Sequence, residues 1–409
     1  MIIMFGRYKK VLMDIMYSII SYALPTVMLQ MVAQPFIAAR LTGAQNDLFL
    51  TLLSAVRLGV NVFISVLANL RLLEKKNCQE EPRQEKNINF MFCIACTLCL
   101  LLAGTLTVVY CDELSWSGLA LVLLVAALIS FHDYYAICFR VSINYRKVMI
   151  DNALIVVGYG VGLLWFLAIP RWEVVFISGY LFGSVYVLIS SDMWKKGLDS
   201  KVPGRLYGSY AALSASSALT NSITYCDKLL MYPMLESGSV SSYNAAAVVS
   251  KIISIVTVPL RNVLLSYVVN RKKLVLPRKQ LMMLLALVLG GSLIVYGGGY
   301  GVSHLLCSLL YPMYYGVAKL YIPIIMLSIV FESLASLGKV LLMPFAKASL
   351  QTIISAVKLG TYVLMIILLE LVFPLDLLGF CLASLLANTA MMLCVFGNLL
   401  KHIELTNHR

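Results

Sequence analysis

Long apolar runs separated by short polar segments constrain this chain more than any other sequence feature. Most of them reach or exceed the roughly 20 residues that a helix needs to cross the hydrocarbon core of a bilayer. Such a helix satisfies its own backbone hydrogen bonds inside lipid. The pattern therefore predicts an all-α integral membrane protein with about twelve transmembrane helices. The runs lie at about 11–39, 47–70, 89–110, 116–139, 150–170, 173–193, 206–232, 241–269, 280–309, 317–345, 351–373 and 376–400.

The composition excludes an ordinary soluble domain. Hydrophobic residues make up 61% of the chain and charged residues only 12%, about half the usual charged share. The formal net charge of +13 does not indicate nucleic-acid binding, because the Lys and Arg residues lie in the connectors between the runs. The first run begins after Arg7, Lys9 and Lys10 and is long, so we interpret it as a spanning helix and not as a cleaved signal peptide.

The basic connectors predict the orientation, because Lys and Arg are retained on the cytoplasmic side of a membrane. With the N-terminus inside, the outside connectors carry only Arg40, Arg171 and Lys319. The alternation of basic and weakly charged connectors favours twelve helices with both termini in the cytoplasm. It also predicts that 71–87 is a solvated cytoplasmic loop. The inside segments hold Arg71, Lys75, Lys76, Arg83, Lys86, Arg140, Arg146, Lys147, Lys195, Lys196, Lys201, Arg205, Arg271, Lys272, Lys273, Arg278, Lys279, Lys347, Lys401 and Arg409.

The basic connector at 195–205 divides the runs into two sets of six. We therefore predict two six-helix bundles, 1–200 and 201–409, around a central cavity. An even number of helices in each half gives repeats of parallel topology. When the second half of the sequence is aligned on the first with an offset of about 195 residues, Arg57 falls almost opposite Lys251. The rise per residue of an α-helix then places each residue about 15 Å from the outer end of its helix.

Charged residues at membrane depth are costly and are the first candidates for a functional site. Cations outnumber carboxylates among these charged residues, so a cavity lined by Arg57, Lys251 and Lys358 would favour an anionic substrate. Arginine suits bidentate contact with phosphate. Arg57 and Lys251 lie too deep for easy snorkelling, which favours a functional role for them. The candidates are Arg57, Lys251, Arg261, Glu332, Lys339 and Lys358, with Asp133, Asp227 and Lys228 nearer the helix ends.

Each candidate also has a structural interpretation. Lys339 and Arg261 could extend to the inner interface, Lys228 could pair with Asp227, and Glu332 could neutralise a neighbouring lysine. For His132 and Asp133 we favour a structural role over a proton relay. Adjacent residues on a helix do not share a face, so we expect that the two side chains do not act together.

No motif of a metal site, a cofactor site or an enzyme is present. Cys93, Cys96 and Cys99 recur every three residues but lie in an apolar run without His or carboxylate neighbours, and cysteine is commonly buried as an apolar residue. A nucleotide-binding loop, a nucleophile elbow and a large outside loop are all missing. We predict no metal and no cofactor, and we favour a transporter over an enzyme.

Two patches resemble the Wzx-like polysaccharide and O-antigen flippases of the multidrug, oligosaccharidyl-lipid and polysaccharide exporter superfamily. The first patch is Ala39 to Gly43 followed by Asp47 and Phe49. The second runs from Tyr225 through the acidic and basic pair Asp227 and Lys228 to Gly238, Tyr243 and the segment 251–259. Together the patches cover about a fifth of the chain.

The resemblance implies two bundles that alternate access to the two sides of a bacterial inner membrane. It implies a glycan on a polyprenyl pyrophosphate as substrate, flipped to the outer leaflet for cell-surface polysaccharide biosynthesis. The phosphates would meet Arg57 and Lys251, with Arg40, Lys358 and Arg261 as further contacts. Besides this substrate and the lipid bilayer, polysaccharide-assembly proteins are candidate partners, and nucleic acid is not.

Three alternatives remain open from the sequence. A cation-coupled drug antiporter of the same superfamily needs an embedded acid, with Glu332 or Asp133 as candidates, because 16–39 contains no carboxylate. A membrane glycosyltransferase or glycan polymerase needs catalytic acids outside the membrane. A scaffold protein of a glycan-assembly complex needs none of these charges.

Overall fold

The fold is all-helical over the part of the chain that is described. The computed structural model describes residues 16–17, 19–74, 81–111, 115–142, 144–250, 252–253, 278–342, 348–372 and 374–407. Within these ranges ten helices are long and apolar enough to cross a membrane. This confirms the predicted all-α architecture of a multi-pass membrane protein.

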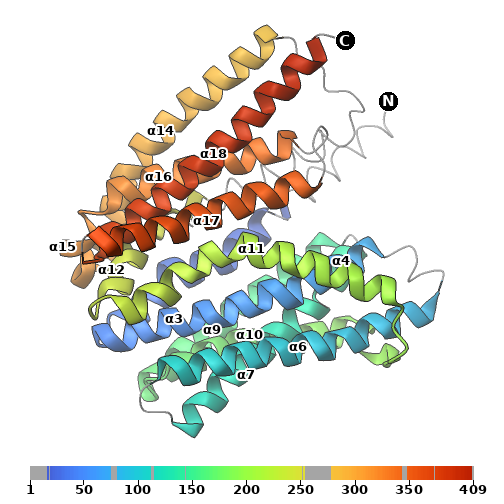
Figure 1. Ribbon diagram of the computed structural model, residues 1–409. Helices are drawn as coiled ribbons and strands as arrows, with labels where there is room; N and C mark the ends of the chain where they lie inside the picture. Colours follow the sequence, from blue (N-terminus) through green and yellow to red (C-terminus); the bar gives the residue numbers. More distant parts are fainter. Residues whose placement is uncertain are drawn as a thin grey trace, which may run out of the picture. The chain divides into compact units, whose positions relative to one another are not determined.

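The chain divides into two compact units, Met1–Leu229 and Leu230–Arg409, and Figure 1 shows their helices. The boundary predicted near residue 200 stays a prediction, because a compact unit does not by itself define which helices move together. The helices that begin in the first unit are η1 (Met28–Ala33), α2 (Gln34–Ala38), α3 (Gly43–Gly59), η2 (Val60–Ile64), α4 (Ser65–Leu73), α6 (Pro82–Tyr110), α7 (Trp116–Tyr135), α8 (Ile137–Val141), α9 (Tyr145–Ala168), α10 (Trp172–Ser190), η3 (Met193–Lys196) and α11 (Gly204–Met234).

The second unit packs around its last helix. There α18 packs against both α16 and α17, while α14 packs against α16. The contact is apolar and includes Ala335 on α16, Ile354 on α17 and Val395 on α18. Its helices are α12 (Ser239–Ala246), α14 (Arg278–Leu310), α15 (Pro312–Ala318), α16 (Ile322–Leu342), α17 (Ala348–Val372) and α18 (Leu377–Asn407).

Local sequence explains where several helices begin. Thr42 caps α3 in a capping box, in which its hydroxyl accepts a hydrogen bond from the Gln45 amide and the Gln45 side chain accepts from the Thr42 amide. Asn144 caps α9 by accepting from the Lys147 amide at 3.2 Å. Pro82 occupies the first turn of α6, where its missing N–H costs nothing.

Glycine allows α9 and α10 to approach closely. A Cβ on Gly158 would lie 2.6 Å from the Ser178 carbonyl oxygen, and one on Gly162 would lie 2.6 Å from the Val175 Cα. Small residues let helix backbones approach one another within membranes. This contact fixes the spacing of the two helices that supply Asp151 and Tyr180 to the polar cluster described below.

The second membrane helix is interrupted by a π-helical segment, η2, between α3 and α4. Two of its carbonyl groups accept hydrogen bonds from α11: the Ser217 hydroxyl donates to the Asn61 carbonyl at 3.0 Å, and the Tyr210 hydroxyl donates to the Phe63 carbonyl at 3.2 Å. Segments of π-helix occur frequently at functional sites. The Ser- and Ala-rich helix α11 therefore docks on η2 through polar groups.

Candidate functional site

The most prominent intramembrane cation in the first unit is Arg57. It lies on α3, is half-buried, and donates from Nη2 to the Tyr180 hydroxyl at 2.5 Å. One helical turn later, Asn61 donates from Nδ2 to the Tyr225 hydroxyl at 2.7 Å. Residues four apart share a helix face, so Arg57 and Asn61 present adjacent donors from the second membrane helix.

Arg57 forms no ion pair within the described residues, where every ion pair involves other side chains. The groups that act on it electrostatically are the hydroxyls of Tyr180, Tyr159 and Tyr225 and the carboxylate of Asp133. A guanidinium has five N–H donors. Arg57 therefore keeps donors for an anionic ligand.

A second group of charges surrounds His132 on α7. Its Nε2 lies 3.0 Å from Asp151 Oδ2, and its Nδ1 lies 3.0 Å from Asp133 Oδ1. The side chains of His132 and Asp151 are only 6% and 3% exposed, whereas that of Asp133 is 28% exposed. We call His132, Asp133 and Asp151 the acid–base cluster.

The expectation that His132 and Asp133 do not act together is wrong. The argument from helix faces considers only the direction in which each side chain leaves the backbone. The imidazole has nitrogens on two sides, so one of them reaches the neighbouring carboxylate while the other reaches α9. The two adjacent residues therefore share one hydrogen-bonded group.

Tyr180 on α10 lies between Arg57 and the acid–base cluster. Besides accepting the Arg57 hydrogen bond, its ring makes an edge contact with the His132 ring, with centroids 5.4 Å apart and planes at 69°. Gly183 makes room for this arrangement, because a Cβ there would lie 2.9 Å from His132 Cδ2. The site thus combines groups from α3, α7, α9 and α10.

Sequence reasoning missed Asp151 and Tyr180. Asp151 falls at the start of a predicted spanning run, a place where a charge is usually interfacial, and nothing in the sequence indicates its histidine partner. Tyr180 is one of 23 tyrosines, and its separation of 123 residues from Arg57 gives no local signal. The position of Asp151 inside an apolar run was the one available sequence signal.

The other predicted cations fall into different environments. Lys251 and Arg261 lie outside the described residues, so the pairing of Arg57 with Lys251 stays a prediction. Arg40 is exposed beyond α2, where it stacks on Phe36 with its Cζ 3.6 Å from the ring centroid. Lys358 on α17 is buried and forms an ion pair with Glu332 on α16 at 2.7 Å. The structural interpretation of Glu332 as a partner of a lysine is therefore confirmed.

The remaining candidates lie near helix ends or on α11. Asp47 is buried in the first turns of α3. Asp227 is buried and Lys228 is half-buried, both toward the end of α11. Lys339, which we expected to extend to the inner interface, donates to the Ser355 hydroxyl at 3.0 Å. The substrate-binding role of all these residues stays a prediction.

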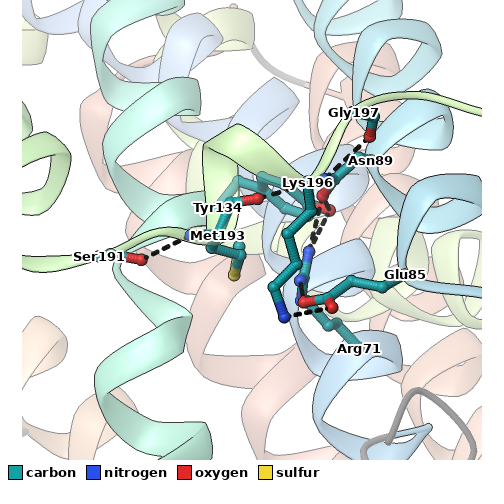
Figure 2. A network of polar contacts seen from close by, with 8 residues as sticks. All are labelled: Arg71, Glu85, Asn89, Tyr134, Ser191, Met193, Lys196 and Gly197. Carbon is teal, nitrogen blue, oxygen red and sulfur yellow. Dashed lines mark hydrogen bonds and ion pairs between the residues drawn. The ribbon is translucent and has the colours of Figure 1, made fainter. Parts of the chain in front are cut away.

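A separate polar network ties the end of α4 to the start of α6 (Figure 2). Arg71 is 4% exposed and forms an ion pair with Glu85, and it donates to Asn89 Oδ1 at 2.7 Å and to the Tyr134 hydroxyl at 2.9 Å. Glu85 also pairs with Lys196 of η3 at 2.5 Å. The prediction of a solvated loop from residue 71 is wrong at this point, because Arg71 is buried and its partner lies on a helix.

These helices and buried charges define a multi-pass membrane protein with the fold of a transporter. No family model matches the sequence, and no curated protein sequence matches it. In structure, the chain resembles an inward-facing multidrug resistance MATE family transporter of the MOP superfamily, with a TM-score of 0.69 and 10% identity over 95% of this chain and 99% of that one.

Two further structures share the fold. The lipid II flippase MurJ, in an inward closed conformation, has a TM-score of 0.71 and 10% identity over 96% of this chain and 90% of its own. The Vibrio cholerae MATE transporter VcmN has a TM-score of 0.59 and 14% identity over 96% of this chain and 97% of its own. The chain therefore shares the fold of these three proteins. These neighbours are described as transporters and a flippase.

Proposed function

We propose that this protein flips a polyprenyl-pyrophosphate-linked oligosaccharide from the cytoplasmic to the outer leaflet of a bacterial inner membrane. The observation that carries the proposal is Arg57, an intramembrane cation that forms no ion pair with a described carboxylate. A charge at membrane depth that is not held in an ion pair is costly. A phosphate ligand would supply that counter-charge.

The neighbours of Arg57 suit a pyrophosphate. Arg57 would contact phosphate oxygens through its remaining N–H groups, and Asn61 lies on the same helix face with an amide as a further donor. Tyr225 holds that amide in position at 2.7 Å. Lys251, predicted at the equivalent depth in the second half, would supply a second cation.

Two further points support this substrate class. The fold is shared with MurJ, which is described as a lipid II flippase. The basic connectors of the sequence predict that both termini lie in the cytoplasm, which fits a carrier that loads its substrate on the cytoplasmic side. The product would serve cell-surface polysaccharide biosynthesis, of which O-antigen assembly is one form.

The proposal is tested by leaflet exchange in liposomes. Purified protein is reconstituted with a fluorescent polyprenyl-pyrophosphate glycan, and a membrane-impermeant quencher reports the fraction in the outer leaflet. We expect exchange with the unaltered protein and a loss of about ten-fold or more with Arg57→Ala, since charged hydrogen bonds contribute about 1.5–3 kcal/mol. The matched control is Arg83→Ala, which removes an arginine that is 61% exposed. Equal loss in both variants would contradict the proposed site.

A second candidate function rests on the acid–base cluster. A buried histidine between two carboxylates is suited to bind and release a proton, as a cation-coupled drug antiporter requires. Proteoliposomes with an imposed pH gradient and a cationic dye would test this. Efflux that is abolished by Asp151→Asn, in vesicles that do not flip the glycan, would favour the antiporter over the flippase.

A further inference from the structure

Tyr180 contacts both charged groups of the first unit. We propose that Tyr180 is a positioning residue that couples the acid–base cluster to Arg57, so that a proton on the cluster and a phosphate on Arg57 promote each other's binding. This inference rests on the proposed function of Arg57 as a phosphate contact. It adds a regulatory connection that the sequence did not indicate.

The geometry on the Arg57 side restrains the guanidinium. The Tyr180 hydroxyl accepts from Arg57 Nη2 at 2.5 Å, and the Arg57 Cζ lies 5.3 Å from the centroid of the same ring. Tyr180 is itself only 6% exposed, and its ring makes an edge contact with Tyr159, with centroids 6.2 Å apart. A long arginine side chain loses considerable rotamer freedom when it is ordered. Tyr180 therefore fixes Arg57 in advance of ligand binding.

The geometry on the histidine side leaves little room for independent movement. The edge contact of Tyr180 with His132 is 5.4 Å between ring centroids, and the α10 backbone at Gly183 lies so close that a Cβ there would be 2.9 Å from His132 Cδ2. Well-packed rings transmit displacements because interiors have few voids. A change in the hydrogen bonds of His132 will therefore displace the Tyr180 ring and with it the hydroxyl that holds Arg57.

Electrostatics gives the direction of the coupling. A proton added to the acid–base cluster adds one positive charge to the surroundings of Arg57, which favours an anion there. Farnesyl pyrophosphate, a soluble polyprenyl pyrophosphate, should therefore bind more tightly at lower pH. The charged and titratable groups that act on the cluster and on Arg57 are Asp133, Asp151, Arg140, Tyr159, Tyr180, Tyr225 and Cys99.

A double-mutant cycle tests the coupling. Binding of farnesyl pyrophosphate to the purified full-length protein is measured by calorimetry for the unaltered protein, Tyr180→Phe, His132→Gln and the double variant. Tyr180→Phe keeps the ring and removes only the hydroxyl. We expect His132→Gln to change the affinity by about five-fold or more when Tyr180 is present, within the usual range for coupled sites, and by much less in the Tyr180→Phe background. Additive effects would overturn the proposal.

A pH series separates coupling from a purely structural role. The ionisation of farnesyl pyrophosphate is the same for every variant, so differences between variants report the protein. The gain in affinity as the pH is lowered from 11 to 6, a range that spans protonation of the cluster, should be smaller in Tyr180→Phe than in the unaltered protein. The matched control is Tyr225→Phe, whose hydroxyl bonds with Asn61, and it should keep the full gain. A Tyr180→Phe variant that binds more weakly but keeps the full gain would overturn the coupling.

Failure of the proposed function has a different outcome. If the unaltered protein does not bind farnesyl pyrophosphate, Arg57 is not a pyrophosphate contact. The coupling between Arg57 and His132 is then measured without a ligand. Melting temperatures of Arg57→Gln, His132→Gln and the pair are compared with and without Tyr180→Phe. Non-additive shifts that need the Tyr180 hydroxyl support the coupling, and additive shifts in both backgrounds overturn it.

Discussion

The Tyr110 hydroxyl at the end of α6 donates a hydrogen bond of 2.8 Å to the carbonyl of Leu229 on α11. This carbonyl is the one that Pro233 leaves without its helical donor, because proline has no N–H to offer the residue four positions earlier. A side chain from another helix thus satisfies the backbone group that the proline leaves unpaired.

Tyr110→Phe should destabilise the protein because it leaves the Leu229 carbonyl without this donor. An unsatisfied buried acceptor costs about 1–3 kcal/mol, which thermal unfolding in detergent would detect. The control is the same change in a Pro233→Ala background, where the restored helical N–H should make Tyr110→Phe cost much less. Equal costs in the two backgrounds would show that the carbonyl does not need Tyr110.

Gly183→Ala should disturb the acid–base cluster. The added Cβ would lie 2.8 Å from Ile155 Cγ1 and 2.9 Å from His132 Cδ2, so the side chains of Ile155 and His132 must shift to admit it. Overpacking of this kind costs about 1–3 kcal/mol. Gly160→Ala on α9 is the matched control, because nothing lies within 4 Å of its Cβ. Unfolding in detergent should show a loss for the first variant only.

Glu85 pairs with two cations of very different burial, which predicts unequal effects. Glu85→Gln would leave Arg71 charged at 4% exposure, and removing one partner of a buried pair costs about 3–5 kcal/mol. Lys196→Met removes a partner that is 51% exposed, and such surface pairs contribute about 0–1 kcal/mol. Similar losses of stability in the two variants would mean that Arg71 is solvated.

The two partners of the ion pair in the second unit should also differ in how much their removal lowers stability. The Lys358 side chain is 8% exposed and that of Glu332 is 45% exposed. Glu332→Gln leaves the more buried charge unpaired, so it should destabilise more than Lys358→Met. The double variant should recover part of the loss. Denaturant titrations of the three variants measure the order, and a greater loss in Lys358→Met would contradict it.

The connector after η3 should loosen in acid. The Lys201 amide and then the Arg83 side chain hold the pKa of Asp199 below its ordinary value near 3.8. A lowered folded-state pKa gives stability that is present above pH 4 and is lost as the pH falls through the lowered value. The protection of 195–203 against hydrogen exchange, corrected for the intrinsic rate at each pH, should therefore fall below about pH 4. Asp199→Asn should show fast exchange already at neutral pH, and unchanged exchange would show that Asp199 does not hold the connector.

The sequence predicted the fold well because spanning helices are local features. Their length, apolar content and spacing are set by the thickness of the bilayer, so runs such as 150–170 and 376–400 correspond to α9 and α18. Arg57 could also be selected from sequence, because any charge at membrane depth is costly. Both inferences need only the residue and its immediate neighbours along the chain.

The partners of these charges were decided only by the tertiary structure. Asp151 meets His132, Tyr180 meets Arg57 and Glu332 meets Lys358 because packed helices bring together faces from distant segments. Glycines such as Gly158 and Gly162 set the spacing that permits these contacts. Helix periodicity specifies which residues share a face, whereas packing specifies which faces meet. For that reason the sequence by itself determined the spanning helices and their costly charges, and the structure alone decided which charges are paired.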